Sequence, residues 1–163
     1  MRPDDLLFED ARILWPNFGG NPTLYNRDGD RMFNIWLPDK KTAEELAEKT
    51  WNVKEKTVKE TGEPYWLLPV AVKFENYPPT IHKVGNLTAQ DVLLNEETVE
   101  LLDLLTIVHA KLHITPYDWS VNGKTGRKAY LREGWFIVDE SPLTLKMQQT
   151  LREWEPGTPL FGD

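Results

Sequence analysis

An Asn-Gly pair near the end of the chain separates two long runs of β-favouring residues, and this feature most limits the possible folds. The runs are Thr106–Trp119 and Arg127–Val138, and Asn122-Gly123 lies in the connection Ser120–Gly126. Asn-Gly is the strongest short-range signal for a β-hairpin, because a tight hairpin turn needs two residues with positive φ. The sequence therefore predicts a β-hairpin as the closing unit of the fold.

Upstream segments add more strands and only short helical stretches. Strand-like patterns with flanking turn residues mark Ala11–Phe18, Arg31–Leu37, Trp51–Val58, Tyr65–Phe74 and Thr80–Val84. Pro16 predicts a bend or an edge at the end of the first of these strands. Helix signals mark Asp39–Thr50, with Thr42 and Glu45 as a candidate capping box, and Asn95–Leu105, with Asn95 as its cap. We expect about five to seven strands, two helices and a non-strand tail from Asp139.

This order of elements favours a small antiparallel barrel. Strands do not alternate with crossover helices, so a parallel α/β sheet is not expected. We predict a mainly β fold with two short helices, a β-barrel of the oligonucleotide/oligosaccharide-binding (OB) type, and a β-sandwich stays open as the alternative. The predicted barrel domain spans residues 1–140, and residues 141–163 form a C-terminal tail that is flexible or binds a partner.

The composition excludes several classes of protein. The chain has 163 residues and no cysteine, which rules out disulfides, thiolate metal sites and cysteine nucleophiles. No apolar run approaches the roughly 20 residues of a membrane helix, and the acidic start does not have the pattern of a signal peptide. We expect a cytoplasmic protein without membrane contact.

The net charge of −7 argues against a nucleic-acid partner, because such binders usually have a basic surface. Many carboxylates, however, lie in Thr42–Lys49, in Asn95–Asp103 and at the two termini, whereas many lysines and arginines lie in predicted strands and their loops. This segregation allows one basic face on an acidic body.

The passage Pro116–Leu131, PYDWSVNGKTGRKAYL, combines aromatic and basic residues within one predicted hairpin. Binding of a single nucleic-acid strand needs flat side chains on which bases stack and cations that hold the phosphates. The aromatic candidates are Tyr117, Trp119 and Tyr130, and the basic candidates are Lys124, Arg127 and Lys128. The alternative is that the aromatics pack the barrel while the lysines keep an edge strand soluble.

A second candidate region surrounds a glycine turn after the first strand. Its candidate residues are Tyr25, Arg27 and Arg31, and Lys54 and Lys56 on a later predicted strand complete the proposed nucleic-acid-binding set. The same loop superficially resembles a calcium loop, but Leu37 stands where the twelfth-position glutamate is required. A solvated hairpin loop is the simpler alternative.

Signatures of catalysis and of metal binding are missing from the sequence. His109 and His113 lie in a predicted strand, where a spacing of four residues separates them by about 13 Å, too far to share a metal ion. Gly123-Lys124-Thr125 resembles the end of a phosphate-binding loop, but Asp118 stands where the first glycine is required. We expect a protein that is not an enzyme and that uses neither a cofactor nor a metal.

Several short segments resemble those of phage-encoded single-stranded-DNA-binding proteins with an OB fold. The segments are ARILWPNFGG (Ala11–Gly20), LYNRDGDRMF (Leu24–Phe33), WNVK (Trp51–Lys54), Pro78-Pro79 and PYDWSVNGKTGRKAYL (Pro116–Leu131). The resemblance implies sequence-tolerant binding of single-stranded DNA in the barrel groove, during phage DNA replication or recombination in the host cytoplasm. Trp15 departs from the family pattern, which often has a polar or basic residue before the Asn-Phe pair.

Three functions are compatible with these observations. The leading hypothesis is single-stranded-DNA binding with little sequence preference. The alternatives are an acidic inhibitor or DNA mimic that targets a host nucleic-acid-binding defence enzyme, and a phage structural module. The acidic tail, which ends in Leu160-Phe161-Gly162-Asp163, predicts docking to replication or recombination proteins, and exposed aromatic strands would permit a homo-oligomer.

Overall fold

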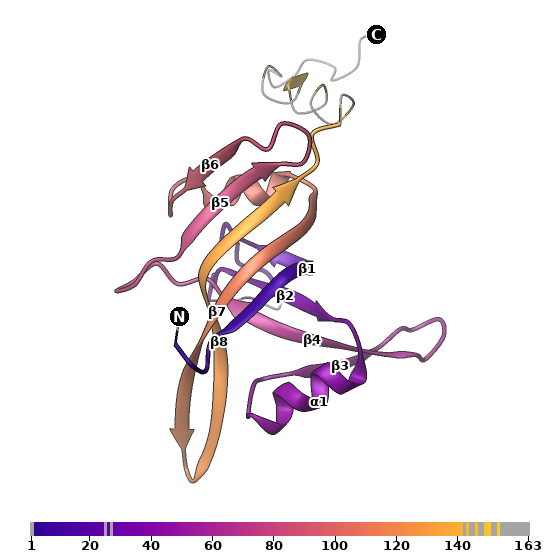
Figure 1. The fold of residues 1–163 in the computed structure, drawn as a ribbon, viewed down its shortest axis with the longest axis vertical. Coiled ribbons are helices and arrows are strands. Elements are labelled where there is room, and N and C mark those ends of the chain that lie inside the picture. Colours follow the sequence, from indigo (N-terminus) through magenta and orange to yellow (C-terminus); the bar gives the residue numbers. More distant parts are fainter. Residues whose placement is uncertain are drawn as a thin grey trace.

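Strands dominate this computed structural model, as the sequence predicts (Figure 1). The described residues are 2–24, 26, 28–141, 143, 146, 149, 150 and 153. Among them the strands are β1 (Leu6–Asn17), β2 (Met32–Leu37), β3 (Lys54–Thr57), β4 (Pro64–Ala71), β5 (Thr80–Gly85), β6 (Asp91–Leu94), β7 (Ile107–Val121) and β8 (Lys124–Val138). The helices are α1 (Lys40–Glu48) and the 3₁₀ helix η1 (Val99–Leu104).

Five of the strands close into a barrel. The sheet order is β3-β4-β2-β1-β7-β8-β5-β6, and an additional parallel pairing joins β4 to β8 through Val70–Ala129 and Ala71–Tyr130. This pairing completes the ring β4-β2-β1-β7-β8. A small five-stranded barrel of this kind is the OB architecture. The prediction of an OB-like barrel is therefore confirmed. The alternative prediction of a β-sandwich is wrong, because the sheet closes on itself.

Three phenylalanines fill the barrel interior. Phe18, Phe33 and Phe136 are fully buried, and their ring centroids lie 5.1 to 5.7 Å apart. Phe136 meets both other rings edge to face, an arrangement that adds about 0.5–1.5 kcal/mol per pair beyond burial of area. Val99 and Leu102 of η1 belong to the same buried cluster. The 3₁₀ helix therefore contributes to the barrel core.

Helix α1 packs its apolar side against the barrel. Ala43 and Leu46 are buried, whereas most of the other residues of α1 are exposed. Asp39 has extended backbone and its carboxylate accepts a hydrogen bond from the Thr42 amide at 2.7 Å. The predicted capping box at Thr42 is therefore wrong, because Thr42 already lies inside the first turn. No helix in the described part of the chain has the length and apolar character of a membrane span.

The first strand is longer than predicted and carries a bulge. β1 begins at Leu6, and its register against β2 shifts between Leu14 and Asn17. Trp15 has positive φ at this bulge, and 57% of its surface is exposed. The bend predicted from Pro16 is confirmed.

Other predicted boundaries also differ from the structure, including that of β3, which spans Lys54–Thr57 where Trp51–Val58 was predicted. The β7–β8 turn is shorter than Ser120–Gly126, because Asn122 and Gly123 both have positive φ and close a two-residue turn. The predicted helix Asn95–Leu105 is a 3₁₀ helix that begins later, although the Asn95 side chain does accept hydrogen bonds from the Glu97 and Thr98 amides. Strand β6 was not predicted from the sequence.

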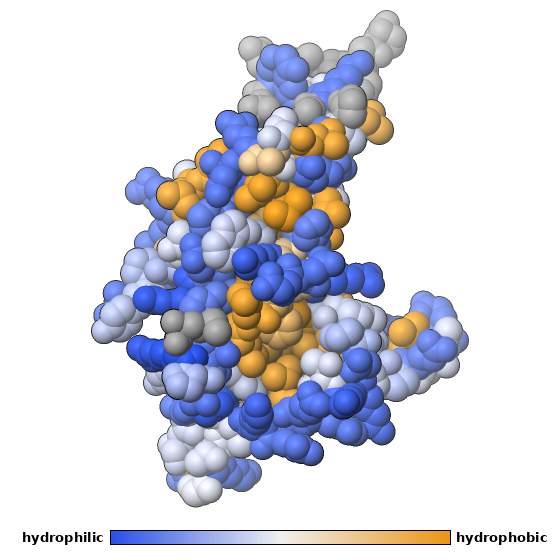
Figure 2. Space-filling model, viewed as in Figure 1, coloured by the Kyte–Doolittle hydropathy of each residue, from blue (hydrophilic) through white to orange (hydrophobic). Residues whose placement is uncertain are grey.

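Strands β5 and β6 extend the sheet beyond the barrel. On the face shown in Figure 2, hydrophobic residues gather beside β1 and α1, and others lie over the β5–β6 end. Leu93 of β6 and Leu87 of the β5–β6 turn are among the exposed apolar side chains. β5 is attached to the barrel by its parallel pairing with β8.

His82 joins three strands of this extension. Its Nδ1 lies 3.0 Å from the Asp91 carboxylate of β6, its Nε2 lies 2.9 Å from Glu133 of β8, and its ring stacks on Trp135. Burial acts to lower the pKa of His82, but the hydrogen bonds and charges of Glu133 and Asp91 outweigh burial and hold that pKa above its ordinary value. The two carboxylates therefore favour the protonated form of His82.

The stability of the fold is expected to decrease as the pH rises through the raised pKa of His82. The ion pairs contribute fully below the unfolded pKa of about 6.5 and are lost above the folded pKa, because only the protonated imidazole gains from both carboxylates. Thermal melting between pH 6 and pH 9 would measure this loss. The His82→Gln variant should show a smaller decrease over the same range, and an equal decrease in both proteins would contradict the assignment.

Candidate nucleic-acid interface

An aromatic pair stands on the outside of β2 and β4. Phe33, Ile35 and Leu37 of β2 face the core, so strand alternation turns Trp36 outward. Trp36 stacks on Tyr65 of β4, with centroids 5.0 Å apart and rings 9° from parallel. The Arg12 guanidinium lies 4.9 Å from the Trp36 centroid.

The candidate residues proposed from the sequence did not include this pair. The signal that could have found it is the alternation in RMFNIWL, which turns Trp36 away from the core-facing side chains. The pairing of Trp36 with Tyr65 depends on the β2–β4 register, which short strands do not specify by themselves.

Two predicted lysines border this aromatic pair. Lys54 pairs with Leu67 and Lys56 pairs with Tyr65 across the β3–β4 ladder, so both lysines lie on the outward side of β4. Both are exposed, and neither forms an ion pair with a described residue. Their ammonium groups are therefore available to an anion.

A second aromatic pair stands on the β7–β8 hairpin. Tyr117 and Tyr130 stack with centroids 5.2 Å apart and rings 6° from parallel. Lys128 is the cross-strand partner of Tyr117, and its Nζ lies 5.7 Å from the Tyr130 centroid. Lys124 is on the same side of β8 by alternation, four residues before Lys128.

Trp119 extends this hairpin surface toward the turn. It pairs with Gly126, and a Cβ atom added at Gly126 would come within 2.3 Å of the indole. The absence of a side chain at Gly126 therefore lets the indole lie against the backbone of the opposite strand. Trp119 remains 40% exposed, so part of its surface is open to a ligand.

The parallel closure of the barrel joins the two aromatic pairs into one surface. β4 and β8 are parallel here and Ala71 pairs with Tyr130, so the residues two positions earlier on each strand, Pro69 and Lys128, are also neighbours. Both lie on the outward side of the barrel. Lys73 and Lys128 also line a small cavity of about 90 Å³ with Pro69. Tyr65 and Ala71 are about 20 Å apart along β4. We name this surface the barrel groove; it comprises Trp36, Lys54, Lys56, Tyr65, Pro69, Tyr117, Trp119, Lys124, Lys128 and Tyr130.

Arg127, although predicted as a site residue, lies on the other side of β8. Its Nε donates to the Asp118 carboxylate at 2.8 Å, its Nη2 lies 3.8 Å from Asp4, and its guanidinium lies 5.5 Å from the Trp51 centroid. Only 17% of the side chain is exposed. Arg127 therefore connects the hairpin to the segment after α1 and to the N-terminal segment.

Arg31 is similarly engaged within the protein. Its Nη1 donates to the carbonyl oxygens of Phe18 and Glu96 at 3.0 and 3.2 Å, and its guanidinium lies 5.3 Å from the Phe74 centroid. These contacts connect the end of β1 to the loop before η1. Tyr25 and Arg27, the other two predicted residues of this region, lie outside the described residues.

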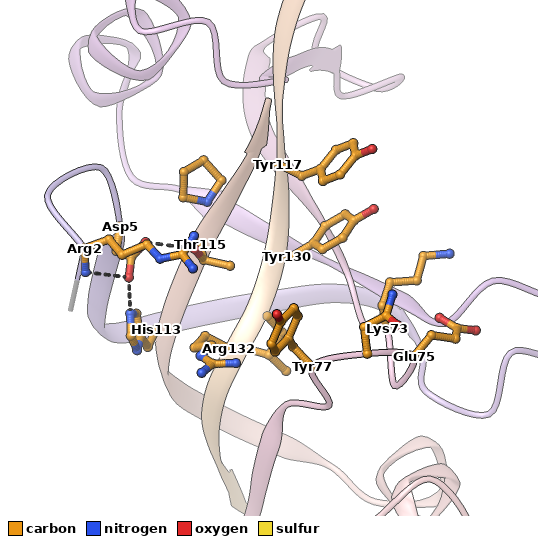
Figure 3. Close-up of a pocket in the computed structure, with 13 residues that line it drawn as sticks. Arg2, Asp5, Lys73, Glu75, Tyr77, His113, Thr115, Tyr117, Tyr130 and Arg132 are labelled. Carbon is orange, nitrogen blue, oxygen red and sulfur yellow. Dashed lines mark hydrogen bonds and ion pairs between the residues drawn. The ribbon is translucent and has the colours of Figure 1, made fainter. Parts of the chain in front are cut away.

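A larger cavity of about 650 Å³ adjoins the hairpin tyrosines (Figure 3). Tyr117 and Tyr130 form one wall, and Lys73, Tyr77 and Arg132 also line it. Lys73 lines both cavities, so the larger one continues the barrel groove. Tyr77 and Arg132 were not among the residues predicted from the sequence, where the Pro78-Pro79 pair was the only nearby signal.

A buried carboxylate, that of Asp5, is among the groups that line this larger cavity. Asp5 accepts hydrogen bonds from the Thr115 hydroxyl at 2.9 Å and from the Arg2 amide at 3.1 Å, and it lies 2.7 Å from His113 Nε2. Burial acts to raise the pKa of Asp5, but these hydrogen bonds together hold that pKa below its ordinary value. The N-terminal segment is therefore anchored to β7 beside the cavity.

Comparisons with known proteins show the family and the fold of the chain. The family model described as "Putative phage ssDNA-binding domain" matches residues 1–151. The single-stranded DNA-binding protein from bacteriophage Enc34, in its C-terminal truncation, is 14% identical with a TM-score of 0.51, covering 85% of this chain and 87% of that chain. Its complex with ssDNA is 13% identical with a TM-score of 0.52, covering 85% and 88%.

A further structure of the Enc34 protein is 12% identical with a TM-score of 0.51, covering 95% of this chain and 87% of that chain. At these identities the likeness shows the fold. No curated protein sequence matches the chain. The family match covers most of the chain, and the chain therefore belongs to the family of phage single-stranded-DNA-binding domains.

Proposed function

We propose that this chain binds single-stranded DNA with little sequence preference along the barrel groove. The observation that carries the proposal is the β4–β8 pairing, because it joins the Trp36–Tyr65 and Tyr117–Tyr130 pairs into one surface with exposed lysines. Any base can stack on an aromatic face, at about 1–3 kcal/mol per base, and lysines attract phosphates without reading sequence. The membership in a family of single-stranded-DNA-binding domains supports the same function.

The lysines of the groove favour DNA binding over DNA mimicry. A mimic needs a coherent acidic face in place of the phosphates, whereas Lys54, Lys56 and Lys128 border the stacked aromatics. Many of the acidic residues lie elsewhere, such as the three glutamates of α1. The net charge of −7 is therefore compatible with a locally basic groove.

We further propose that the protein takes part in phage DNA replication or recombination as a non-catalytic binding protein. In this proposal residues 1–140 bind DNA, and the tail, residues 141–163, recruits replication or recombination proteins. Its acidic residues Glu153, Glu155 and Asp163 and its apolar Leu160-Phe161 pair support a docking role. Deleting Pro156–Asp163 should abolish partner binding while DNA binding persists; unchanged partner binding would contradict the docking role.

The function is tested by fluorescence titration with labelled oligo-dT at low and moderate salt. We expect binding that weakens as salt rises, because displaced counterions oppose binding at high salt. A DNA duplex of equal length is the control and should bind more weakly. The absence of oligo-dT binding at low salt would contradict the proposed function and favour the inhibitor hypothesis.

Replacing Lys128 with alanine should reduce the salt dependence of binding, whereas replacing its neighbour Arg127 should not. Loss of one phosphate contact on a single strand lowers the slope of log K against log salt by about 0.7. Arg127 instead bonds Asp118 and packs on Trp51, so the Arg127→Ala variant should melt at a lower temperature with an unchanged slope. Equal slopes for wild type and Lys128→Ala would contradict the placement of Lys128 in the groove.

A further inference from the structure

Tyr77 is held away from the protein body at the edge of the 650 Å³ cavity. The ring is 80% exposed, although tyrosine usually buries most of its ring. Asn76 has a positive φ of 67°, and the Tyr77 amide donates to the Glu75 carbonyl at 2.8 Å. Pro78 and Pro79 follow and restrict the backbone. The local backbone therefore restricts the directions in which the Tyr77 side chain can point.

An aromatic wall lies across the cavity from this segment. In Figure 3, Tyr117 and Tyr130 point the same way, and Tyr77 lies beyond Tyr130. Tyr117 covers one face of Tyr130, and the cavity adjoins the Tyr130 ring. A volume of about 650 Å³ is within the range of roughly 300–1,000 Å³ typical of small-ligand sites. Tyr77 and Tyr130 therefore line one cavity whose volume is large enough to receive a planar group.

Two cations, Arg132 and Lys73, line this space together with the carboxylate of Glu75. Arg132 lies where the β7–β8 register skips one residue, since His113 pairs with Glu133 and Ile114 pairs with Leu131. Such a bulge re-aims a side chain, and Arg132 lies beside Tyr77 in Figure 3. Arg132 has no ion-pair partner among the described residues.

Lys73 is a second cation at the cavity and contacts Asp30 at 3.4 Å. Both partners of this ion pair are at least one-third exposed, so the pair is weak and can exchange for another anion. The cavity is thus lined by aromatic residues from two separate segments and by two cations that can hold a phosphate.

We propose that this cavity is a subsite for a single nucleobase, which leaves the stack of its neighbours and inserts between Tyr77 and Tyr130. Lys73 and Arg132 hold the phosphate next to that nucleotide. The subsite rests on the proposed function and extends it, because it lies at the end of the barrel groove and receives one defined position of the bound strand. A duplex cannot supply this base without unpairing it.

The test combines protein variants with single abasic positions in a labelled oligo-dT of about 16 nucleotides, the upper end of OB-fold site sizes. One abasic position should weaken binding to the wild-type protein by roughly 5- to 150-fold, which is the loss of affinity expected when one base no longer stacks. The Tyr77→Ala variant should bind the intact oligonucleotide more weakly than the wild type does, by the same factor. Its affinity should not fall further when the abasic position is introduced. Tyr77→Phe keeps the ring and should bind as the wild type does.

Tyr130→Ala distinguishes failure of the subsite from failure of the proposed function. If Tyr77→Ala binds the intact and abasic oligonucleotides as the wild type does, while Tyr130→Ala weakens binding, the subsite is wrong and the groove stands. If the wild-type protein binds no oligo-dT, the proposed function fails and the subsite fails with it. Leu104→Ala is the matched control, since Leu104 is 78% exposed on η1, outside the cavity lining.

Discussion

Replacing Phe136 with alanine is expected to lower the free energy of unfolding by about 3–5 kcal/mol. The Phe136 ring is fully buried and meets Phe18 and Phe33 edge to face at 5.1 and 5.7 Å. The substitution removes one of three mutually packed rings and leaves a cavity that the surrounding strands fill only in part. Urea unfolding followed by tryptophan fluorescence would measure the loss.

The control for this prediction is Leu104→Ala, which removes an exposed apolar side chain. That variant should change the free energy of unfolding by less than about 0.5 kcal/mol. If Phe136→Ala cost less than about 1 kcal/mol, the aromatic cluster would not be the main source of barrel stability. If Phe136→Ala failed to fold, Phe136→Leu would serve instead, with a smaller loss expected because leucine fills part of the space.

Replacing both Tyr117 and Tyr130 with alanine is expected to weaken binding of single-stranded DNA more than any single lysine substitution. Each base that loses its stacking partner costs about 1–3 kcal/mol, so the double variant should bind oligo-dT at least about fivefold more weakly. Titration of labelled oligo-dT at fixed salt measures the loss. The salt slope should change little, because the phosphate contacts remain.

Trp135→Ala is the matched control for the tyrosine pair. Trp135 also stacks on another ring, that of His82, but it lies on the β5–β8 extension outside the barrel groove. Its replacement should leave DNA affinity unchanged even if it lowers stability. Equal losses in the tyrosine and tryptophan variants would show that the groove is placed on the wrong surface.

Local sequence signals account for much of the fold. The Asn122-Gly123 pair predicts the β7–β8 hairpin, because only residues tolerant of positive φ close so short a turn. The same passage predicts Tyr117, Trp119, Lys124, Lys128 and Tyr130 as candidate site residues, all on one side of that hairpin. Their common side follows from strand alternation, which is a local property. The role of these residues in DNA binding stays a prediction.

Strand alternation also separates Lys128 from Arg127, although both were predicted from the sequence as nucleic-acid-binding residues. The two residues are adjacent in β8, so they point to opposite sides, and only Lys128 belongs to the barrel groove. Arg31 was also predicted as a site residue, but its side chain is bonded within the protein. Its partners Phe18 and Glu96 are remote in sequence, so no local pattern reveals these contacts.

The sequence by itself determined the strand-rich order of elements, the closing hairpin and the residues that alternate on it, because these depend on backbone preferences of neighbouring residues. Only the tertiary structure decided that β4 pairs with β8, that Trp36 stacks on Tyr65, and that Tyr77 lines the same cavity as the hairpin tyrosines. These contacts join residues far apart in the chain. Their geometry depends on closure of the whole barrel, which no short segment specifies.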